Sequence, residues 1–330
     1  MPILSVNIGR SEVSLLAFNS IDDFKVYNYP YVINDPSFLK ELIKTASKEL
    51  KIPTLAKYDL LVCGFPEIPD IGMEAKLAMT LDKVSASIKE FFPVFVSNFS
   101  ILTASSFLSA AKLEYVDVTL SDFFPNLSIY PYLVPNDSLE QFTLDNFVRF
   151  FPNELIANNI NVPMVFSGDR FGYMFNNDPL SYMLIFDLVK TLGVYELRVD
   201  SNNILANLAM IARYDDKYSN ILAEYKFESL GVLINAEGTV EGLIETEDGT
   251  RQLFEVKNEQ LFVVPLALGR NRIVLKNAQL GTIEKTVLGG TLGLIVDTRP
   301  KNNPEIYNAT YIEKQLNIWA NSVKEVITSL

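Results

Sequence analysis

The chain opens with ILSVNIGRSEVSLLAF, residues 3–18, and this stretch decides how the fold begins. Residues 3–7 are interpreted as a buried strand, Gly9-Arg10-Ser11 is typical of a tight turn, and apolar side chains alternate over residues 12–18. Alternation with a period of two residues is the pattern of a half-buried strand. The chain is therefore expected to start with a β-hairpin.

Helices and strands are expected to alternate after the hairpin. Asp35-Pro36 is typical of a helix start, and apolar residues then recur at helical spacing over residues 36–51. Residues 58–64 have the pattern of a buried strand, and residues 73–92 are broadly helical in pattern. This alternation predicts a first α/β lobe over residues 1–114.

A second α/β lobe is predicted over residues 115–226, because its elements repeat part of the first pattern. Strands are expected at 115–119, 162–167 and 195–199, and helices at 139–158, 179–191 and 203–213.

The period changes again after residue 227. Seven short β-branched runs with Gly-containing turns predict a small β-rich sandwich or barrel module over residues 227–298. The acidic run 241–248 is expected on a solvated hairpin edge, where charge discourages aggregation. Residues 299–330 are expected to end the chain with a closing helix.

The composition excludes several kinds of chemistry. The chain has no histidine and one cysteine, Cys63, so histidine-dependent triads, imidazole bases, histidine-bound metals and intrachain disulfides are ruled out. Cys63 follows an apolar run and is interpreted as a small buried residue. The formal charge of −12 repels phosphate backbones, so we expect no nucleic-acid partner.

The sequence also bears on location. No basic segment followed by a long apolar run precedes residue 7, which predicts a cytoplasmic protein. Residues 91–111 carry no charge, but a proline and many polar side chains lower their hydrophobicity below that of a spanning helix. No membrane insertion is expected.

Three segments are similar to the nucleotide loops of the superfamily that contains actin, the sugar kinases and the chaperone ATPases. Residues 7–11 resemble its first phosphate loop, residues 117–119 its second, and residues 165–169 its adenosine loop. The resemblance implies an ATP and magnesium site in which Asp117 positions the metal or the attacking water. The nucleotide-binding residues that it implies are Asn7, Gly9, Arg10, Ser11, Thr119, Ser167 and Gly168.

Residues 160–320 also resemble the MutL-like family of glutamate mutase accessory proteins, which has the same fold. The matching segments are 163–168, 193–200, 264–269 and 289–299. The resemblance implies an α/β protein with a two-lobed actin-like (ribonuclease H-like) body and a small β-rich C-terminal module. Gly289, Gly290 and Gly293 have a second interpretation as turn or bulge residues, with Asp297 and Arg299 as a surface pair.

The departures from the superfamily pattern predict a degenerate nucleotide site. Asn7 stands where the superfamily carries Asp, so the charge that attracts a divalent cation is missing. Asp117 is followed by Val118 rather than by glycine, and Asp169 replaces a glycine of the adenosine loop. We therefore expect no metal site, no conventional acid/base catalysis and negligible hydrolysis.

The function expected from these features is that of an actin-like scaffold or assembly factor that binds a protein partner or itself. Two aromatic turns are the expected contact points, Phe123-Phe124-Pro125 and Phe150-Phe151-Pro152. Two alternatives remain open. One is an ATP-dependent accessory or chaperone ATPase for a cobalamin-dependent mutase, and the other is a cytoplasmic adaptor of a membrane machine similar to the FtsA and PilM group.

Overall fold

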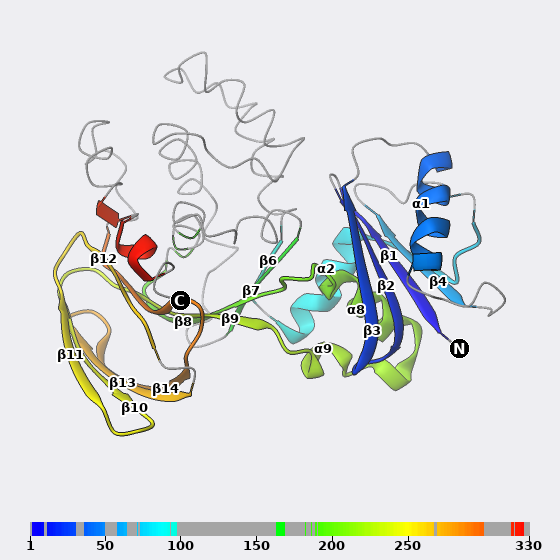
Figure 1. The fold of residues 1–330 in the computed structure, drawn as a ribbon. Helices are drawn as coiled ribbons and strands as arrows, with labels where there is room; N and C mark the ends of the chain where they lie inside the picture. The colour runs from blue at the N-terminus through cyan, green and yellow to red at the C-terminus, as the bar shows by residue number, and fades with distance from the viewer. Residues whose placement is uncertain are drawn as a thin grey trace, which may run out of the picture.

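The structure of the protein is a computed structural model with three β-sheets among the residues that it describes (Figure 1). It is a mixed α/β protein. Figure 1 places the five-stranded sheet at one end and the four-stranded sheet at the other. The structure describes residues 2–9, 12–30, 36–49, 58–64, 71, 73–92, 94–97, 163–168, 182, 186, 189, 191–266, 269–299, 318–319 and 321–326.

The first sheet has five strands in the order β3-β2-β1-β4-β5. Its first three strands are antiparallel neighbours, while β4 and β5 run parallel to β1. The expected β-hairpin is confirmed, because β1 and β2 pair from Ile3 opposite Phe18 to Ile8 opposite Val13. The strands are β1 (Ile3–Ile8), β2 (Glu12–Ser20), β3 (Asp23–Pro30), β4 (Asp59–Gly64) and β5 (Leu77–Thr80).

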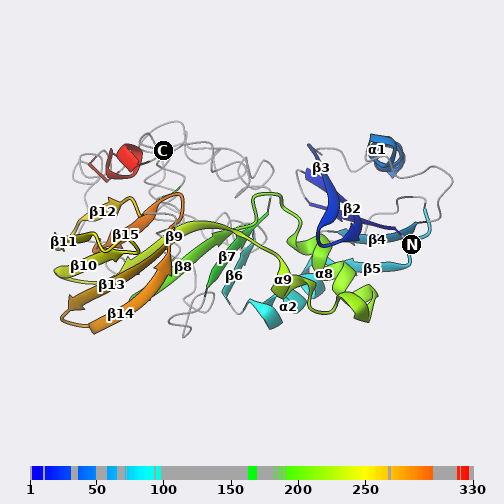
Figure 2. The same cartoon turned by 60° about the horizontal axis from the view of Figure 1, so that its bottom comes forward.

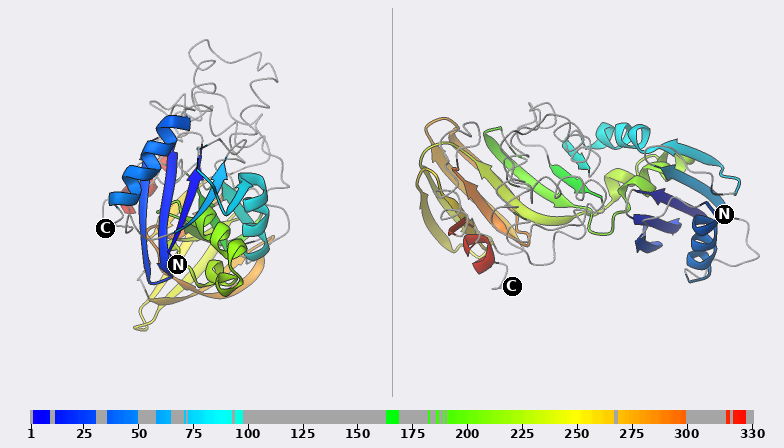
Figure 3. Two further views of the ribbon diagram at one scale, coloured as in Figure 1. Left: turned by 90° about the vertical axis from the view of Figure 1, so that its right-hand side faces the viewer. Right: turned by 90° about the horizontal axis from the view of Figure 1, so that it is seen from above.

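Helices cover both faces of this sheet (Figure 3). On one face, α1 (Pro36–Glu49) buries Leu39 and Ile43 against the even-numbered side chains of β1. The other face carries α2 (Leu81–Phe91), α8 (Leu205–Tyr214) and α9 (Ile221–Glu224). The first helix is confirmed over nearly its expected range. A short 3-10 turn, η2 (Asp216–Tyr218), joins α8 to α9.

The helix α8 comes from far along the chain. It lies within residues 115–226 of the sequence, yet it packs on β1 and β4 of the first sheet and on the neighbouring helix α2. Seven of its ten residues are buried, so the N-terminal sheet needs this later segment to complete its core. Burial of that apolar face is the main force that holds the helix there.

The second sheet has six strands in the order β12-β15-β9-β8-β7-β6. Strands β6, β7 and β8 are parallel, β9 is antiparallel to β8 and parallel to β15, and β12 is antiparallel to β15. The strands are β6 (Val94–Ser97), β7 (Met164–Ser167), β8 (Gly193–Val199), β9 (Glu228–Asn235), β12 (Leu261–Val264) and β15 (Gly293–Asp297).

The third sheet is antiparallel, with the order β11-β10-β13-β14. Figure 2 shows it beside β9, β12 and β15, and one buried apolar cluster joins the two sheets. Every buried member of that cluster except Val194 comes from residues 227–298. The strands are β10 (Val240–Thr246), β11 (Arg251–Val256), β13 (Arg270–Asn277) and β14 (Gly281–Leu288).

All seven strands expected between residues 227 and 298 are confirmed. They divide between two sheets, because β9, β12 and β15 pair with one another and, through β9, with β8. The predicted module boundaries at 227 and 298 stay predictions, as do the boundaries of the two lobes.

Two expectations about the helices and strands need correction. Residues 73–92 are not helical throughout, because Leu77–Thr80 pairs as β5 with the open edge of β4 before α2 begins. Tertiary pairing overrides the helix propensity of Ala78 and Met79 there. Strand β3 was not predicted. The acidic run does not lie on an edge strand, since β10 is central in its sheet.

The glycine-rich segment before β15 has a structural role. Gly293 has a φ of +72°, and a Cβ atom there would lie 2.3 Å from the carbonyl oxygen of Val264. At Gly231, with a φ of +137°, a Cβ atom would lie 2.2 Å from the carbonyl oxygen of Gly293. The interpretation of Gly293 as a turn residue is therefore confirmed, because only glycine permits this close approach of three chain segments.

The pair Asp297 and Arg299 is buried, so the surface position expected for it is wrong. Arg299 Nη2 donates to Asp297 Oδ2 at 2.8 Å, and Arg299 Nε donates to Asp297 Oδ1 at 2.9 Å. The guanidinium also lies over the Trp319 ring, 5.2 Å from its centroid. This pair ties the C-terminal helical residues to the end of β15.

Gly242 lies at a tightly packed position between the two sheets. It lies opposite Phe254, whose Cζ atom would be 2.2 Å from a Cβ atom at position 242. Replacing glycine in a strand normally stabilises it, but here Gly242→Ala should lower the free energy of unfolding by about 1–3 kcal/mol through overpacking. Urea denaturation measures this. Adding Phe254→Leu should recover part of the loss, and an unchanged midpoint in Gly242→Ala would contradict the packing.

Candidate functional site

A set of buried polar side chains joins the first sheet to the segment that carries α8. We call this set the polar seam. Its members are exposed by 5% or less, although they lie among apolar residues. They are Ser5, Glu12 and Ser14 of the first sheet, Ser167 of β7, and Asp200, Asn203 and Asn207 of the later segment.

The first part of the polar seam fixes α8 on the sheet. Ser5 Oγ donates to Asn207 Oδ1 at 2.9 Å, and Asn207 Nδ2 donates to Ser14 Oγ at 3.2 Å. Buried polar groups must find partners inside the protein, and leaving one unpaired costs roughly 1–3 kcal/mol. The hydrogen bonds to these two strands therefore fix where α8 lies along the sheet and how close it lies to it.

The second part is the turn between β8 and α8, residues 200–203. Asn203 has a φ of +52°, a left-handed conformation that asparagine tolerates better than most residues. Its backbone N–H donates to the carbonyl oxygen of Asp200 at 3.1 Å, and its Nδ2 donates to Glu12 Oε1 at 3.1 Å. This turn thus contacts the residue that immediately follows the predicted first phosphate loop.

Asp200 joins this turn to β7. Its Oδ2 accepts a hydrogen bond from Ser167 Oγ at 2.8 Å and one from the backbone N–H of Leu205 at 2.8 Å. The second bond satisfies a free N–H group at the start of α8. Complete burial raises the pKa of the Asp200 carboxyl, and the hydrogen bonds from Leu205 and Ser167 only partly offset that effect.

Asn7 lies beside the polar seam but does not join its network. Its side chain is 7% exposed and stands opposite Ser14 on β2 and Cys63 on β4. Within the part of the chain that the structure describes, the buried Asn7 Oδ1 accepts no hydrogen bond. An unpaired buried acceptor is uncommon and costly, so this amide oxygen is the atom available to a ligand that donates a hydrogen bond.

Described residues of two of the three predicted nucleotide loops lie at the polar seam, through the backbone of Gly9 in the first loop and the side chain of Ser167 in the adenosine loop. Asn7 lies near the end of β1 and Gly9 follows that strand, where the backbone N–H of Gly9 donates to the carbonyl oxygen of Glu12 at 2.8 Å. Ser167 and Gly168 lie at the end of β7, with the Ser167 hydroxyl already bonded to Asp200. Outside the described residues lie Arg10, Ser11, Asp117, Thr119, Phe123, Phe124, Phe150, Phe151 and Asp169.

Sequence reasoning missed most of the polar seam, although the sequence holds a signal for it. In β1 and β2, polar residues recur at every second position beside apolar ones, as Ser5 and Asn7 do. Asp200, Asn203 and Asn207 are spaced three and four residues apart at the start of an apolar helix. Polar residues that share one face of a buried element indicate a polar contact inside the protein.

Other chemistry finds little support in the part of the chain that the structure describes. No group of three or more Cys, Asp or Glu side chains within it could hold a metal ion. Cys63 is buried as expected, and burial raises the pKa of its thiol to about 12. Within the same residues, no helix combines the length and the apolar character needed to cross a membrane.

No family model and no curated protein matches the chain. Among solved structures it is similar to the activator of the 2-hydroxyisocaproyl-CoA dehydratase from Clostridium difficile with bound ADPNP. The two chains share 11% identity and a TM-score of 0.40 over 68% of this chain and 98% of the activator.

A second solved structure is the ethanolamine utilization protein EutJ from Carboxydothermus hydrogenoformans. It shares 8% identity and a TM-score of 0.37 over 64% of this chain and 89% of EutJ. Both neighbours have the actin-like ATPase fold.

The raised pKa of Asp200 predicts a pH dependence of stability. A carboxyl whose pKa is raised by folding stabilises the folded state below its unfolded pKa, about 3.9, and loses that contribution as the pH rises. Asn cannot titrate. We therefore subtract the free energy of unfolding of Asp200→Asn from that of the wild type, both from urea titrations. This difference should decrease as the pH rises from 4 to 7.

Asp248 supplies a control of opposite sign. Its pKa is lowered, first by the hydrogen bond from the Thr246 side chain, so its contribution is present above the unfolded pKa and lost as the pH falls. The free energy of unfolding of the wild type, minus that of Asp248→Asn, should decrease as the pH is lowered. If the difference for Asp200→Asn also decreased as the pH is lowered, Asp200 would be stabilised as an anion, contrary to this prediction.

Proposed function

We propose that the protein is a two-lobed actin-like scaffold or assembly factor that acts in the cytoplasm through protein contacts, with a degenerate nucleotide site. The first sheet supports the fold. Three antiparallel strands followed by two parallel ones, in the order β3-β2-β1-β4-β5, are the arrangement of a ribonuclease H-like sheet. Function still depends on the site and not on the fold.

The observation that carries the proposal is the internal pairing of the polar seam. Ser167 is one of the residues expected to bind nucleotide, but its hydroxyl donates to Asp200 instead. The next polar group after the first predicted loop, Glu12, is buried and accepts from Asn203. These side chains stabilise the contact between chain segments, so they are not free to bind a ligand.

Charge supports the same conclusion. A nucleoside triphosphate at this position would approach the buried carboxyl groups of Glu12 and Asp200 and would oppose their ionisation, because like charges repel each other more strongly in a buried site than in water. Asn7 offers a neutral amide oxygen where a hard divalent cation prefers a carboxylate. Productive binding of the magnesium complex is therefore disfavoured.

Asn7 keeps one alternative open, which is ligand binding without hydrolysis. Its unpaired Oδ1 could accept a hydrogen bond from a hydroxyl or amino group, both of which a nucleotide carries. An ATP-dependent accessory protein for a cobalamin-dependent mutase would need more, because Asp117 would have to position the metal or the attacking water.

Phosphate release tests the proposal directly. We expect purified protein with ATP and magnesium to release phosphate far more slowly than the turnover of about 1 per second that is typical of enzymes. A malachite green assay measures this, with Asp117→Asn as the matched variant. Turnover at an enzymatic rate that Asp117→Asn abolishes would overturn the scaffold function and favour the ATPase.

The aromatic turns are the proposed partner contacts. Replacing Phe123 and Phe124, or Phe150 and Phe151, with serine should reduce association while the fold is kept, because each buried Phe contributes roughly 1.5–3 kcal/mol to a contact. Sedimentation velocity measures self-association, and circular dichroism measures folding. Lost folding would show that the rings belong to a core.

Phe262 on β12 gives the control, since it is 39% exposed and lies outside both turns. Phe262→Ser should leave association unchanged. Equal effects of all three changes would mean that exposed aromatic rings contribute in general, without a specific role for the two turns.

A further inference from the structure

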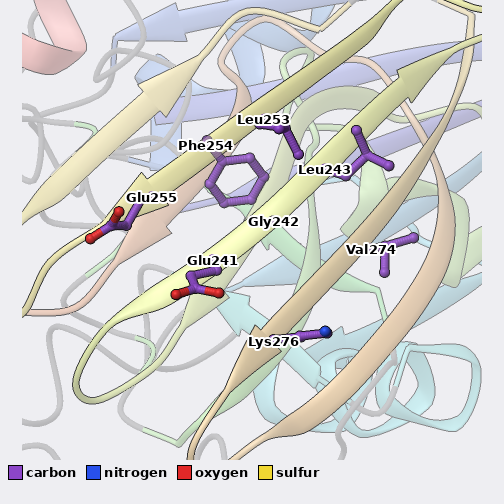
Figure 4. A pocket seen from close by; sticks show the side chains of 8 residues that line it. All are labelled: Glu241, Gly242, Leu243, Leu253, Phe254, Glu255, Val274 and Lys276. Atoms are coloured by element: carbon purple, nitrogen blue, oxygen red, sulfur yellow. The ribbon is translucent and has the colours of Figure 1, made fainter.

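The solvent face of the four-stranded sheet carries three rows of side chains that cross its strands. The first row is charged and runs from Arg251 through Glu245 to Arg272. The second is apolar and contains Leu253, Leu243 and Val274. The third is charged again and contains Glu255, Glu241 and Lys276. The second and third rows line a hollow of about 500 Å³ (Figure 4).

The first row is closed by ion pairs. Glu245 Oε1 lies 2.8 Å from Arg251 Nη2, and Glu245 Oε2 lies 2.8 Å from Arg272 Nη1. Arg272 Nε donates to Glu284 Oε1 at 2.8 Å, which brings in the neighbouring strand β14. Each arginine of the row therefore already has a carboxylate partner.

The third row is open, although it lies on the same face of the same strands. Glu241 and Glu255 stand directly opposite each other on β10 and β11. Within the described structure, neither carboxylate has an ion pair or a hydrogen bond, and neither does Lys276. Lys276 stands opposite Glu241 on its other side, on β13, but Glu255 on β11 faces only Glu241. Like charges at opposed positions destabilise a sheet, so the Glu241–Glu255 pair is unfavourable, and a cation between the two carboxylates would relieve it.

The apolar row between them is also exposed. Leu253 is 81% exposed, while Leu243 and Val274 are half-buried beside it. The row crosses three strands of a regular sheet, so its backbone is held rigidly and little order has to be gained when a partner binds. Water contact with these side chains is unfavourable, and an apolar group placed on them would remove it.

We propose that this hollow is a docking surface for a basic segment of another protein, in which lysine or arginine side chains alternate with apolar ones. The apolar side chain would cover Leu253, Leu243 and Val274, and the cation would lie between Glu241 and Glu255. A surface for a partner presupposes the proposed assembly function, and it gives that function a partner of defined chemistry.

Charge decides among the occupants. A second copy of this chain would bring another net charge of −12, and a two-fold axis along the apolar row would set Glu241 against the partner copy's equivalent of Glu245. Nucleic acid is repelled by the same carboxylates. A basic and partly apolar protein segment complements both rows at once.

The test is a titration of the full chain with a synthetic peptide of alternating lysine and leucine, followed by calorimetry. We expect binding that weakens as salt is added, because exposed charge pairs are screened. Glu241→Gln with Glu255→Gln should weaken binding by about tenfold or more, since both carboxylates that face the cation are lost. Leu253→Ser should weaken it through the apolar row.

Two controls match these changes. Asp22→Asn with Glu74→Gln removes the same charge from exposed positions in the N-terminal part of the chain, and Leu288→Ser removes another exposed leucine, on β14. Both should bind the peptide as the wild type does. Absence of wild-type binding, unchanged binding by the Glu241 and Glu255 variant, or equal weakening by the remote charge control would overturn the proposal.

A second readout needs no ligand. Relief of the opposed carboxylates predicts that Glu255→Gln, which leaves Glu241 opposite Lys276, raises the melting temperature by about 1–2 °C at low salt and by less at high salt. A lowered melting temperature would show that the open row stabilises the sheet and would overturn the proposal. Phosphate release from the same samples separates the two failures, because hydrolysis contradicts the scaffold function and leaves the peptide result intact.

Discussion

The hydrogen bonds of one fully buried amide, the side chain of Asn207, hold the two halves of the described structure in register. Asn207 binds Ser5 and Ser14 on adjacent strands, so α8 has one favourable position on the first sheet. The turn before α8 is held in the same way through Asn203 and Asp200. Strand β8 precedes this segment in the chain and β9 follows it, and the two strands pair in the second sheet. The position of the second sheet therefore depends on the same contacts.

This use of polar atoms also limits the chemistry that the site can perform. A buried hydroxyl or carboxyl that stabilises the protein cannot bind a ligand without breaking an internal bond, at a cost of roughly 1–3 kcal/mol for each group left unpaired. Ser167 and Asp200 are in that position. Asn7 is the exception beside the polar seam, since its amide oxygen has no partner to lose among the described residues. Structural pairing and ligand binding are therefore alternatives at this junction.

Much of the fold is predictable from local pattern. The hairpin of residues 3–18, the helix that starts at Pro36 and the seven strands after residue 227 all follow from periodicity and turn residues, which act within a few residues of the chain. Strand β5 does not follow, because Ala78 and Met79 favour a helix until the edge of β4 is there to pair with them. Of the polar seam, only Ser167 was predicted, because a resemblance singled out the adenosine loop that contains it.

By itself, the sequence determined most of the helices and strands, the absence of histidine chemistry and the acidic character of the chain. These properties depend only on composition and on residues that are close together along the chain. Only the tertiary structure decided that α8 completes the first sheet, that Asp297 and Arg299 are buried, and that Glu241 and Glu255 stand opposite each other beside an exposed apolar row. The physical reason is that burial and pairing depend on which distant segments meet, and hydrogen bonds and ion pairs act over a few ångströms in space whatever the separation along the chain.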